Sequence, residues 1–453
     1  MEINIPAGAS AIIERLEAHG YEAYIVGGCV RDSLMGKTPS DWDICTSARA
    51  EEMLALFEDK RVIPTGIQHG TLTILAADGA YEVTTFRIDG EYLDHRHPKS
   101  VAFTRELAED LSRRDFTINA MAWHPERGLI DLFGGEHDLS HRLVRAVGDP
   151  TQRFDEDGLR MLRMVRFATV LDFDYDQATY DAVLAQNHLL DYISKERIQV
   201  ELNKILLAAH PARGLADLYT LGMYPYIIPV MCHTVGFAQE GGHHFLDVFE
   251  HSLLAVGVTQ PELVLRLTMF LHDIGKPFTW DATGATDYDR FNDHAAVGAK
   301  IASRVLRQLK YDNATRKAVV ELIRHHNDLI LPDEVNVRQT LARLGEVQTR
   351  RLVQVKIADL IAHDLGSERA ETVAFFDEIT AVIDRVTSRG DCVRVKNLAV
   401  GGREMQALGL SGRAIGRALD ALLEQVLVDP AFNERDRLLA WVREHAEALS
   451  DQQ

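Results

Sequence analysis

Apolar residues in the first third of the chain fall into short runs that Gly or Asp residues separate. Three of these runs are rich in β-branched residues, namely AYIVGG (23–28), GTLTILAA (70–77) and YEVTTFRI (81–88). Short runs of this composition with flanking turn residues are typical of strands, and stretches with helical spacing lie between them. The pattern predicts a mixed sheet with helices over roughly the first 145 residues.

From about Asp149 onward the strand pattern fades, and apolar residues recur at three- and four-residue spacing. Each of the clearest segments predicts one helix, so the chain as a whole is expected to be of the α+β class. The segments have no fixed repeat length, which disfavours a solenoid. A polar stretch, SRGD (388–391), marks a last boundary before a small helical tail. The helical segments are EDGLRMLRMVRFATVL (156–171), ERIQVELNKILLAA (196–209), ELVLRLTMFLHDIG (262–275) and RKAVVELIRHH (316–326).

Length and composition indicate a multidomain globular protein. The 453 residues favour two to four domains, and 46% hydrophobic with 26% charged residues is a globular composition. The N-terminus, MEINIPAGAS, lacks a basic region followed by an apolar run, and no apolar stretch reaches the roughly 18 residues of a membrane span. We therefore expect a cytoplasmic protein with no membrane partner. Reduced thiols are expected because the four cysteines are scattered without a CxxC pair.

The net charge of −19 disfavours a protein that coats nucleic acid nonspecifically, because phosphate binding relies on clustered Lys and Arg. Basic residues nevertheless gather locally, so an RNA substrate would have to be held at such clusters. Three clusters occur, formed by Arg96, Lys99, Arg105, Arg113 and Arg114, by Arg153, Arg160, Arg163 and Arg166, and by Arg403, Arg413 and Arg417.

Candidate chemistry is concentrated in IVGGCVRDSLMGKTPSDWDICTS (25–47). Gly27 and Gly28 follow an apolar strand, and their missing side chains let backbone N–H groups approach a triphosphate. Asp41 and Asp43 are two residues apart, which places both carboxylates on one face if the segment is a strand. Such a pair can hold Mg²⁺ through oxygen ligands. Glu82, on another predicted strand, can complete the set.

At these residues the chain resembles the nucleotidyltransferases of the DNA polymerase β superfamily. The longer pattern resembles the class II tRNA nucleotidyltransferase and bacterial poly(A) polymerase family, because further motifs follow in that family's order over the first 210 residues or so. These motifs are LSRRDFTINAMA (111–122), IDLFGGEHDL (130–139), FDEDGLRMLRMVRF (154–167) and ISKERIQVELNKIL (193–206).

The resemblance implies a role for each matching residue. Carboxylates would bind the catalytic Mg²⁺ ions, arginines would bind phosphate or ribose, and one Asp/Arg pair would read the base. The implied metal ligands are Asp41 and Asp43, the phosphate or ribose ligands are Gly28, Arg31, Arg114, Arg163 and Arg166, and the base-reading residues are Asp157 and Arg160.

The base-reading role of Asp157 and Arg160 also follows from their chemistry. The two residues are three apart on a predicted helix, so they are expected on one face. Asp157 offers only acceptors and Arg160 only donors. Cytosine and adenine both present an amino donor beside a ring acceptor, whereas uracil and guanine present the opposite groups and would leave buried groups unpaired at about 1–3 kcal/mol each. Such a pair can select C and A without a template.

The family contains several activities, and we expect full CCA addition to tRNA from CTP and ATP. The segment DGEYLDHRHPKSVAFTRELAEDL (89–111) looks like the loop of full CCA-adding and A-adding enzymes. The basic strand pair that marks poly(A) polymerases is not evident in VIPTGIQHGTLTI (62–74). A-adding or poly(A) activity remains the alternative. Two carboxylate-bound metals would activate the RNA 3′-hydroxyl and stabilise pyrophosphate as it leaves.

A second chemistry is indicated between residues 243 and 365. The order His251, then His272 with Asp273, then Asp359 resembles the HD phosphohydrolase superfamily, in which imidazoles and carboxylates bind a metal that activates water. His294 and His325, the latter next to His326, match ligands of two-metal HD proteins. Mn²⁺, Ni²⁺ or Mg²⁺ is the expected metal. Phosphatase or phosphodiesterase activity on RNA ends is one expectation, and an inert body domain is the other.

The resemblance implies four parts along the chain. These are a nucleotidyltransferase head (1–145), a helical neck for base and RNA binding (146–210), a helical body (211–388) with an HD core at about 243–365, and a helical tail for tRNA binding (389–453). Two readings from other classes compete. One is a phosphohydrolase with a nucleotide-sensing head, and the other is a non-catalytic RNA-binding protein, which leaves the metal carboxylates unexplained.

Overall fold

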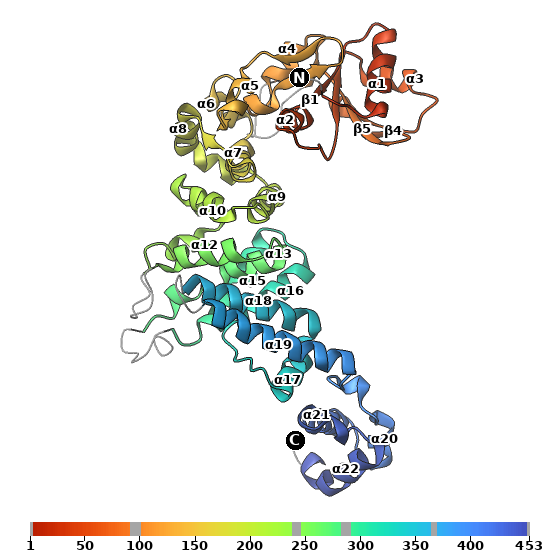
Figure 1. The fold of residues 1–453 in the computed structure, drawn as a ribbon, viewed down its shortest axis with the longest axis vertical. Coiled ribbons are helices and arrows are strands. Elements are labelled where there is room, and N and C mark those ends of the chain that lie inside the picture. Colours follow the sequence, from red (N-terminus) through yellow and green to blue (C-terminus); the bar gives the residue numbers. More distant parts are fainter. Residues whose placement is uncertain (1–2, 91–100, 238–245, 282–290, 364–368, 451–453) are drawn as a thin grey trace. The chain divides into compact units, whose positions relative to one another are not determined.

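The structure is a computed structural model that describes residues 3–90, 101–237, 246–281, 291–363 and 369–450. It divides into two compact units (Figure 1). Unit 1 comprises residues 1–232 with 308–310, and unit 2 comprises residues 233–307 and 311–453. In the described part of the chain no helix is both long and apolar enough to cross a bilayer. All four cysteines are free thiols, as the sequence predicts.

Unit 1 contains the strands of the structure. Seven of them form one mixed sheet in the order β3-β4-β5-β2-β1-β8-β9, and two further pairs, β10-β11 and β6-β7, are separate. The bounds are β1 (Ala23–Val26), β2 (Asp43–Thr46), β3 (Val62–Gly66), β4 (Thr71–Ala76), β5 (Gly79–Thr85), β6 (Arg87–Asp89), β7 (Val101–Phe103), β8 (Met121–His124), β9 (Gly128–Asp131), β10 (Leu143–Val144) and β11 (Asp174–Tyr175).

Helices cover the sheet and then form the rest of unit 1, which confirms the expected α+β class. They are α1 (Ala7–Ala18), α2 (Gly28–Leu34), α3 (Ala50–Leu56), α4 (Leu107–Ser112), α5 (Gly135–Ser140), α6 (Pro150–Glu156), α7 (Leu159–Leu171), α8 (Gln177–Gln186), α9 (Lys195–Leu206), α10 (Pro211–Thr220) and α11 (Tyr224–Ile227).

The interior strand β1 of this sheet is apolar throughout, and helices cover it on both faces. Ile25 points into a core with Ile13 and Leu16 of α1. Tyr24 and Val26 point the other way, into a core with Leu107 and Leu111 of α4. Successive strand residues face opposite sides, so an unbroken apolar run is what a doubly covered strand requires. The interior position of β1 brings the Gly27 turn to the middle of the sheet's edge.

The described residues of unit 2 form helices joined by loops and contain no strand. Its helices are α12 (Val248–Val258), α13 (Leu263–Leu271), α15 (His294–Gln308), α16 (Asn313–His325), α17 (Glu334–Leu344), α18 (Glu346–His363), α19 (Arg369–Arg389), α20 (Gly402–Ala407), α21 (Arg413–Val428) and α22 (Arg435–Ser450). Helix α19 ends at the SRGD stretch, where Gly390 has a φ of +73°. A left-handed residue after the last helical turn is a common way to end a helix.

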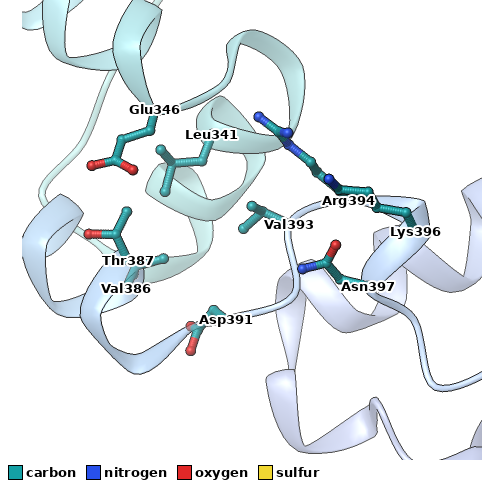
Figure 2. Close-up of a pocket in the computed structure, with 9 residues that line it drawn as sticks. All are labelled: Leu341, Glu346, Val386, Thr387, Asp391, Val393, Arg394, Lys396 and Asn397. Atoms are coloured by element: carbon teal, nitrogen blue, oxygen red, sulfur yellow. The ribbon is translucent and has the colours of Figure 1, made fainter.

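Arg338 of α17 joins the last helices to the rest of unit 2. Its side chain is buried, donates to the carbonyl oxygens of Leu427 and Val428 at 2.7 and 3.1 Å, and pairs with Asp391 at 3.3 Å. Beside this network lies a pocket of about 250 Å³, between α17, α19 and the segment 391–397 (Figure 2). Leu341 and Val386 give it apolar walls, so the segment 391–397 rests on a partly apolar support.

Two local expectations are wrong. The segment 156–171 is not one helix, because α6 ends at Glu156 and α7 starts at Leu159. Asp157 between them is extended (φ −146°, ψ 100°), and its side chain accepts a hydrogen bond from the Leu159 N–H, a contact that competes with the helix. Asp41 likewise precedes a strand rather than lying in one, since β2 starts at Asp43.

Candidate functional site

The head carboxylates meet where β2 and β5 run parallel. Asp43, the first residue of β2, lies directly opposite Glu82 of β5. Residues directly opposite on paired strands point to the same face of a sheet, so the two carboxylates are neighbours. Asp41 lies two residues earlier and accepts a hydrogen bond from Ser40 Oγ at 2.9 Å. Residues 41, 43 and 82 therefore come together, although only two of them lie on strands.

The electrostatics of Asp43 fit a bound cation. Burial and repulsion from Asp41 raise the pKa of the Asp43 carboxyl to about 6, and Glu82 adds to this while Arg114 opposes it. A divalent cation would relieve the same repulsion. Within the described residues, groups of three ligand atoms that all lie within 4.8 Å of one another occur only in unit 2. The head carboxylates are thus spaced more widely, which suits ions that also bind substrate phosphates and water.

Gly27 has a structural requirement that only glycine meets. Its φ is +85°, and a Cβ atom there would lie 3.0 Å from Nη1 of Arg114. The turn between β1 and α2 therefore brings a guanidinium group against the backbone, next to the face that carries Asp43. Gly28 opens α2, where the backbone N–H groups of the first turn are free to bind an anion.

A chain of hydrogen bonds connects the head to the following helices inside unit 1. Arg31 Nη1 donates to Asn119 Oδ1 at 2.6 Å, and Asn119 Nδ2 donates to Asp115 Oδ1 at 3.1 Å. Arg163 of α7 donates to Asp115 Oδ2 at 2.7 Å. Burial opposes ionisation of Asp115, but the Arg163 charge and its hydrogen bonds lower the pKa of this carboxyl to about 2. The two predicted phosphate ligands Arg31 and Arg163 are therefore held by one buried anion.

The ring of Phe167 lies among three of the arginines. The guanidinium carbons of Arg31, Arg163 and Arg166 are 5.2, 5.4 and 3.8 Å from its centroid. Each of these arginines also pairs with a carboxylate, Arg31 with Asp32, Arg163 with Asp115 and Arg166 with Glu201, at 2.8, 2.6 and 2.5 Å. The cluster therefore holds three oriented guanidinium groups in one place, which a triphosphate can contact.

Asp157 and Arg160 lie in the same unit but do not pair with each other. Asp157 accepts two hydrogen bonds from Arg197 of α9, at 3.1 and 2.7 Å. Arg160 is buried, pairs with Glu156 at 2.6 Å and donates to the carbonyl oxygen of Arg113 at 3.0 Å. The expectation of one helical face is corrected, because Asp157 precedes α7. Both side chains are instead oriented by partners from neighbouring segments.

Helix α9 supplies two residues to which the sequence reasoning gave no role. Arg197 binds Asp157, and Glu201, one turn later, pairs with Arg166 at 2.5 Å. Glu201 is only 3% exposed. The sequence does contain a signal for these two residues. Arg197 and Glu201 are oppositely charged and four apart on a predicted helix whose other face is apolar, within the motif ISKERIQVELNKIL (193–206).

A dense His/Asp cluster occupies the core of unit 2. His251 Nε2 lies 3.2 Å from His272 Nε2 and 2.9 Å from Asp359 Oδ1. On the other side of Asp273, His294 Nε2 lies 3.3 Å from His326 Nε2. Gly275 permits this packing, because a Cβ there would lie 2.2 Å from the His294 carbonyl oxygen.

The imidazole orientations suit metal binding. The Nδ1 atoms of His272, His294 and His326 face the carbonyl oxygens of Met269, Phe291 and Ile323 at 2.8, 2.7 and 2.6 Å. A carbonyl can only accept, so each Nδ1 carries a hydrogen, and each ring turns an Nε2 lone pair inward when it is neutral. The Nε2 lone pairs of His294 and His326, 3.3 Å apart, repel each other unless a proton or a metal ion lies between them.

Asp273 faces both halves of the cluster. Its Oδ2 lies 3.2 Å from His272 Nε2 and 2.6 Å from Lys276 Nζ, while its Oδ1 lies 3.6 Å from His294 Nε2 and 3.7 Å from His326 Nε2. Two sets of ligand atoms within 4.8 Å therefore share this carboxylate. A divalent metal fits each set, and Asp273 is placed to bridge two.

The charge state of the cluster agrees with this reading. Burial lowers the pKa of His251, and it lowers the pKa of His294 to about 4, so both are neutral ligands at pH 7. Burial also disfavours the charged form of His272, but Asp273 and Asp359 outweigh it and raise the pKa of His272 to about 10. A metal ion would displace that proton when it binds.

One predicted ligand is misassigned by a single position, and one is missed. His325 points away from the cluster and its Nδ1 lies 2.8 Å from Asp328 Oδ2, whereas the neighbouring His326 is the inward residue. A helix turns about 100° per residue, so consecutive histidines cannot share a face. His363, at the end of α18, joins His251 and Asp359 in a further ligand set.

Three family models match the chain. One described as "Poly A polymerase head domain" matches residues 23–145, one described as "Probable RNA and SrmB- binding site of polymerase A" matches 172–234, and one described as "HD domain" matches 241–364. Their order agrees with the head carboxylates, the following helices and the His/Asp cluster.

The segment 89–111 lies partly outside the described residues, and Arg96 and Lys99 lie outside them.

Known proteins are similar to the chain in sequence and fold. It is 50% identical over 227 residues to a CCA-adding enzyme of Levilactobacillus brevis, a match that spans 50% of this chain and 57% of the relative. A CCA-adding enzyme of Limosilactobacillus reuteri is 49% identical over 48% of this chain and 54% of its own length. The match thus spans about half the length of these relatives. A solved structure of Bacillus stearothermophilus CCA-adding enzyme with CTP is 29% identical, with a TM-score of 0.72 over 98% of both chains.

Proposed function

Because the chain belongs to the class II tRNA nucleotidyltransferase and poly(A) polymerase family, we propose that it adds CCA to the 3′ end of tRNA. CTP and ATP are the nucleotide substrates, pyrophosphate is released, and no nucleic acid template directs the choice. The observation that carries the proposal is the position of Asp43 opposite Glu82, beside the Gly27 turn and in one unit with Asp157 and Arg160. A cytoplasmic location follows from the proposed substrate.

Different residues of the head have different roles in phosphoryl transfer. Asp41 and Asp43 would hold Mg²⁺, with Glu82 as the third carboxylate. When bound, the ions lower the pKa of the RNA 3′-hydroxyl and neutralise charge at the phosphates. The Gly28 turn and the guanidinium groups of the Phe167 cluster bind and orient the triphosphate for in-line attack. The 3′-oxygen bonds to the α-phosphorus while the bond to pyrophosphate breaks, so no covalent enzyme intermediate is needed.

Base choice rests on Asp157 and Arg160. An acceptor and a donor held by separate partners present a fixed pattern, which the amino group and ring acceptor of cytosine or adenine complement. Uracil and guanine would leave buried groups unpaired. Arg114, Arg163 and Arg166 contact only triphosphate or ribose, which every nucleotide shares, so they contribute affinity without selectivity.

The activity test uses purified protein, a tRNA transcript that lacks its 3′ CCA, CTP and ATP. Sequencing of the RNA 3′ ends should find CCA and no longer additions. Runs of A would instead indicate poly(A) polymerase activity, and A added only to tRNA ending in CC would indicate an A-adding enzyme. No addition at all would favour a phosphohydrolase whose head senses nucleotides.

We infer a second activity, metal-dependent phosphohydrolysis, from the unit 2 cluster. His251, His272, Asp273 and Asp359 would bind one Mn²⁺, Ni²⁺ or Mg²⁺, and Asp273 with His294 and His326 would bind another. A metal there activates water for attack on a phosphate ester. The supporting observation is the inward Nε2 atoms of three histidines around one buried carboxylate. Hydrolysis of 2′,3′-cyclic AMP, assayed with each metal, tests it, and absence of hydrolysis with all of them would leave an inert body domain.

A further inference from the structure

His363, the last residue of α18, adjoins the His/Asp cluster of unit 2. It lies four residues after Asp359, so both side chains are on one face of the helix. His363 Nε2 is 3.4 Å from Asp359 Oδ1, and the His363 ring stacks on the ring of His251, with centroids 4.1 Å apart and 27° between the planes. Ligand atoms of these three residues all lie within 4.8 Å of one another. His363 is therefore within reach of an ion that His251 and Asp359 bind.

Asp359 Oδ1 is surrounded by three imidazole nitrogens. The Nε2 atoms of His251, His272 and His363 lie 2.9, 3.3 and 3.4 Å from this one oxygen. One carboxylate oxygen offers about two lone-pair sites, fewer than the nitrogens around it. Hydrogen bonds to Asp359 Oδ1 alone therefore do not account for the convergence, whereas an ion that all four atoms share does.

The distances between these atoms match those between ligands of one metal ion. Two atoms that each lie about 2.0–2.1 Å from an ion are about 2.9–3.4 Å apart when the angle between them is between about 90° and the tetrahedral angle. The three distances to Asp359 Oδ1 fall in this range, as does the 3.2 Å between the Nε2 atoms of His251 and His272. His251 can bind only one ion through its Nε2. The two ligand sets that contain His251 therefore describe one site.

Ion pairing at the end of a helix explains His363 less well. A helix C-terminus and a nearby carboxylate both favour a charged histidine. His325 shows that arrangement, because it ends α16 and its Nδ1 lies 2.8 Å from Asp328 Oδ2. The 3.4 Å between His363 and Asp359 is longer than the roughly 2.7–2.9 Å of a charge-assisted hydrogen bond. The position of His363 is thus better suited to a shared ion than to a direct ion pair.

His363 also lies on the accessible side of the site. Its side chain is 26% exposed and that of Asp359 is 20% exposed, whereas His251 and His272 are buried. A metal site inside a protein needs a path by which the ion enters. His363 and Asp359 are the members of this group that an ion from solution can reach first.

We propose that His363 is a ligand of the first metal site, together with His251, His272, Asp273 and Asp359. The site then offers three imidazoles and two carboxylates. Imidazole ligands favour ions such as Ni²⁺ or Zn²⁺, whereas Mg²⁺ and Mn²⁺ prefer oxygen ligands. The proposal rests on the proposed phosphohydrolase only for the use of the ion, and it assigns Ni²⁺ or a similar late transition metal to this site in preference to Mg²⁺.

The test uses the metal-free full chain as wild type, His363→Ala, His363→Lys and His325→Ala. Lysine keeps a cation at the end of α18 beside Asp359, but its protonated amine has no lone pair for a metal ion. His325→Ala is the matched control, because His325 also ends a helix and pairs with a nearby aspartate. Titration calorimetry measures the affinity of each form for Ni²⁺ and for Mn²⁺, and thermal melting in EDTA checks that each form is folded.

We expect both His363 variants to bind one Ni²⁺ at least about tenfold more weakly than wild type, and His325→Ala to stay within about twofold of wild type. The loss should be larger for Ni²⁺ than for Mn²⁺, because the removed ligand is an imidazole. Wild-type Ni²⁺ affinity in His363→Lys would show that only a cation is needed at the helix end and would overturn the proposal. So would equal weakening in His363→Ala and His325→Ala.

Spectroscopy distinguishes a metal ligand from a residue that only orients Asp359. In a His326→Ala background, which removes a ligand of the other set, electron spin echo spectra of bound Mn²⁺ count the coordinated imidazoles. We expect three imidazoles in this background and two when His363→Ala is added. The same number with and without His363 would contradict direct ligation.

Metal binding and hydrolysis are scored separately. If wild type hydrolyses no phosphate ester but Ni²⁺ affinity falls in the His363 variants only, the proposed activity fails and the ligand assignment stands. If wild type hydrolyses 2′,3′-cyclic AMP and His363→Ala keeps its metal affinity and imidazole count, the activity stands and the ligand assignment is wrong.

Discussion

Arg197 donates two hydrogen bonds to Asp157, a residue 40 positions earlier in the chain, at 3.1 and 2.7 Å. The contact spans from α9 to the break between α6 and α7. It fixes the plane of the Asp157 carboxylate. The backbone of Asp157 is extended rather than helical, so the geometry of a helix does not determine where this carboxylate lies. Both residues are partly exposed, at 29% and 17% of their side chains, so the pair is accessible to a nucleotide while it stays oriented.

Replacing Arg197 should therefore impair nucleotide choice without unfolding unit 1. For Arg197→Ala we expect kcat/KM for CTP to fall by about 10- to 100-fold, because misplacement of a positioning contact by about 1 Å can cost this much. The ratio of CTP to UTP incorporation should fall as well. Arg213→Ala, which removes exposed ion pairs of α10, is the control. Equal CTP to UTP ratios in wild type and Arg197→Ala would contradict the orienting role.

The Asp43 carboxyl should make the metal-free protein less stable at neutral pH. Its folded pKa of about 6 lies above the ordinary value of 3.8, so the folded state holds the proton more tightly than the unfolded state. The ionised group then costs stability above about pH 6, and the cost vanishes below about pH 4. After solvent screening it is of order 1–2 kcal/mol.

Asp43→Asn should accordingly raise the melting temperature in EDTA at pH 7.5 by a few degrees and leave it unchanged at pH 4. Mg²⁺ should stabilise wild type and not the variant. The same variant should lose nucleotide addition. A variant that melts below wild type at pH 7.5 in EDTA would disprove the like-charge account.

The adjacent histidines of α16 provide a matched pair for the unit 2 cluster. His326→Ala removes an inward Nε2 and should abolish metal binding by the set of Asp273, His294 and His326. His325→Ala removes a contact to Asp328 and leaves this set intact. Metal content after dialysis, measured by mass spectrometry, should fall in the first variant alone. Hydrolysis of 2′,3′-cyclic AMP should follow the metal. Equal loss of metal in the two variants would contradict the geometry.

His272→Ala with Asp273→Ala should remove metal from the set with His251 and from the set with His294 and His326, because Asp273 belongs to both sets and His272 to the first. CCA addition should stay within a few-fold of wild type, since the head carboxylates lie in unit 1. Bound metal stabilises the native state by mass action, so melting must be followed alongside. A complete loss of CCA addition in a folded variant would mean that the two sites are coupled.

Arg338→Met should loosen the last helices of unit 2. The substitution keeps much of the volume but leaves the Leu427 and Val428 carbonyl oxygens without this donor, and it removes one partner of the buried Asp391. We expect a loss of about 2–4 kcal/mol in the free energy of unfolding of unit 2. Chemical denaturation measures it, and Arg350→Met, at an exposed ion pair, should cost less than about 1 kcal/mol. Similar losses in both would show that the Arg338 contacts contribute little.

Much of the fold was predictable because its signals are local. The apolar run at 23–26 predicted β1, the helical spacing predicted α9, α13 and α16, and the SRGD stretch predicted the end of α19. The break at Asp157 was missed because helical spacing continues across it, and the competing Leu159 N–H contact is visible only in three dimensions. Asp41 was placed on a strand because a two-residue alternation does not show where a strand begins.

The sequence predicted which residues belong to the candidate sites, but it did not predict which of them contact each other. Residue types and order brought Asp43, Glu82, His272 and Asp273 to attention. Contacts across 40 or more residues, such as Arg197 with Asp157 and Arg163 with Asp115, have no signal in one sequence, because either partner alone is an ordinary surface charge. The choice between His325 and His326 depends on the rotation of α16, which the motif does not specify.

The most direct test of untemplated CCA addition is incorporation with one nucleotide at a time. A tRNA transcript that lacks CCA is incubated with purified protein and CTP, ATP, UTP or GTP alone, and with CTP plus ATP, and the product lengths are resolved on a sequencing gel. We predict two added residues with CTP alone, three with CTP plus ATP, and none with UTP or GTP at the same concentration. Addition of U or G at a rate near that of C, or of A in long runs, would contradict the account.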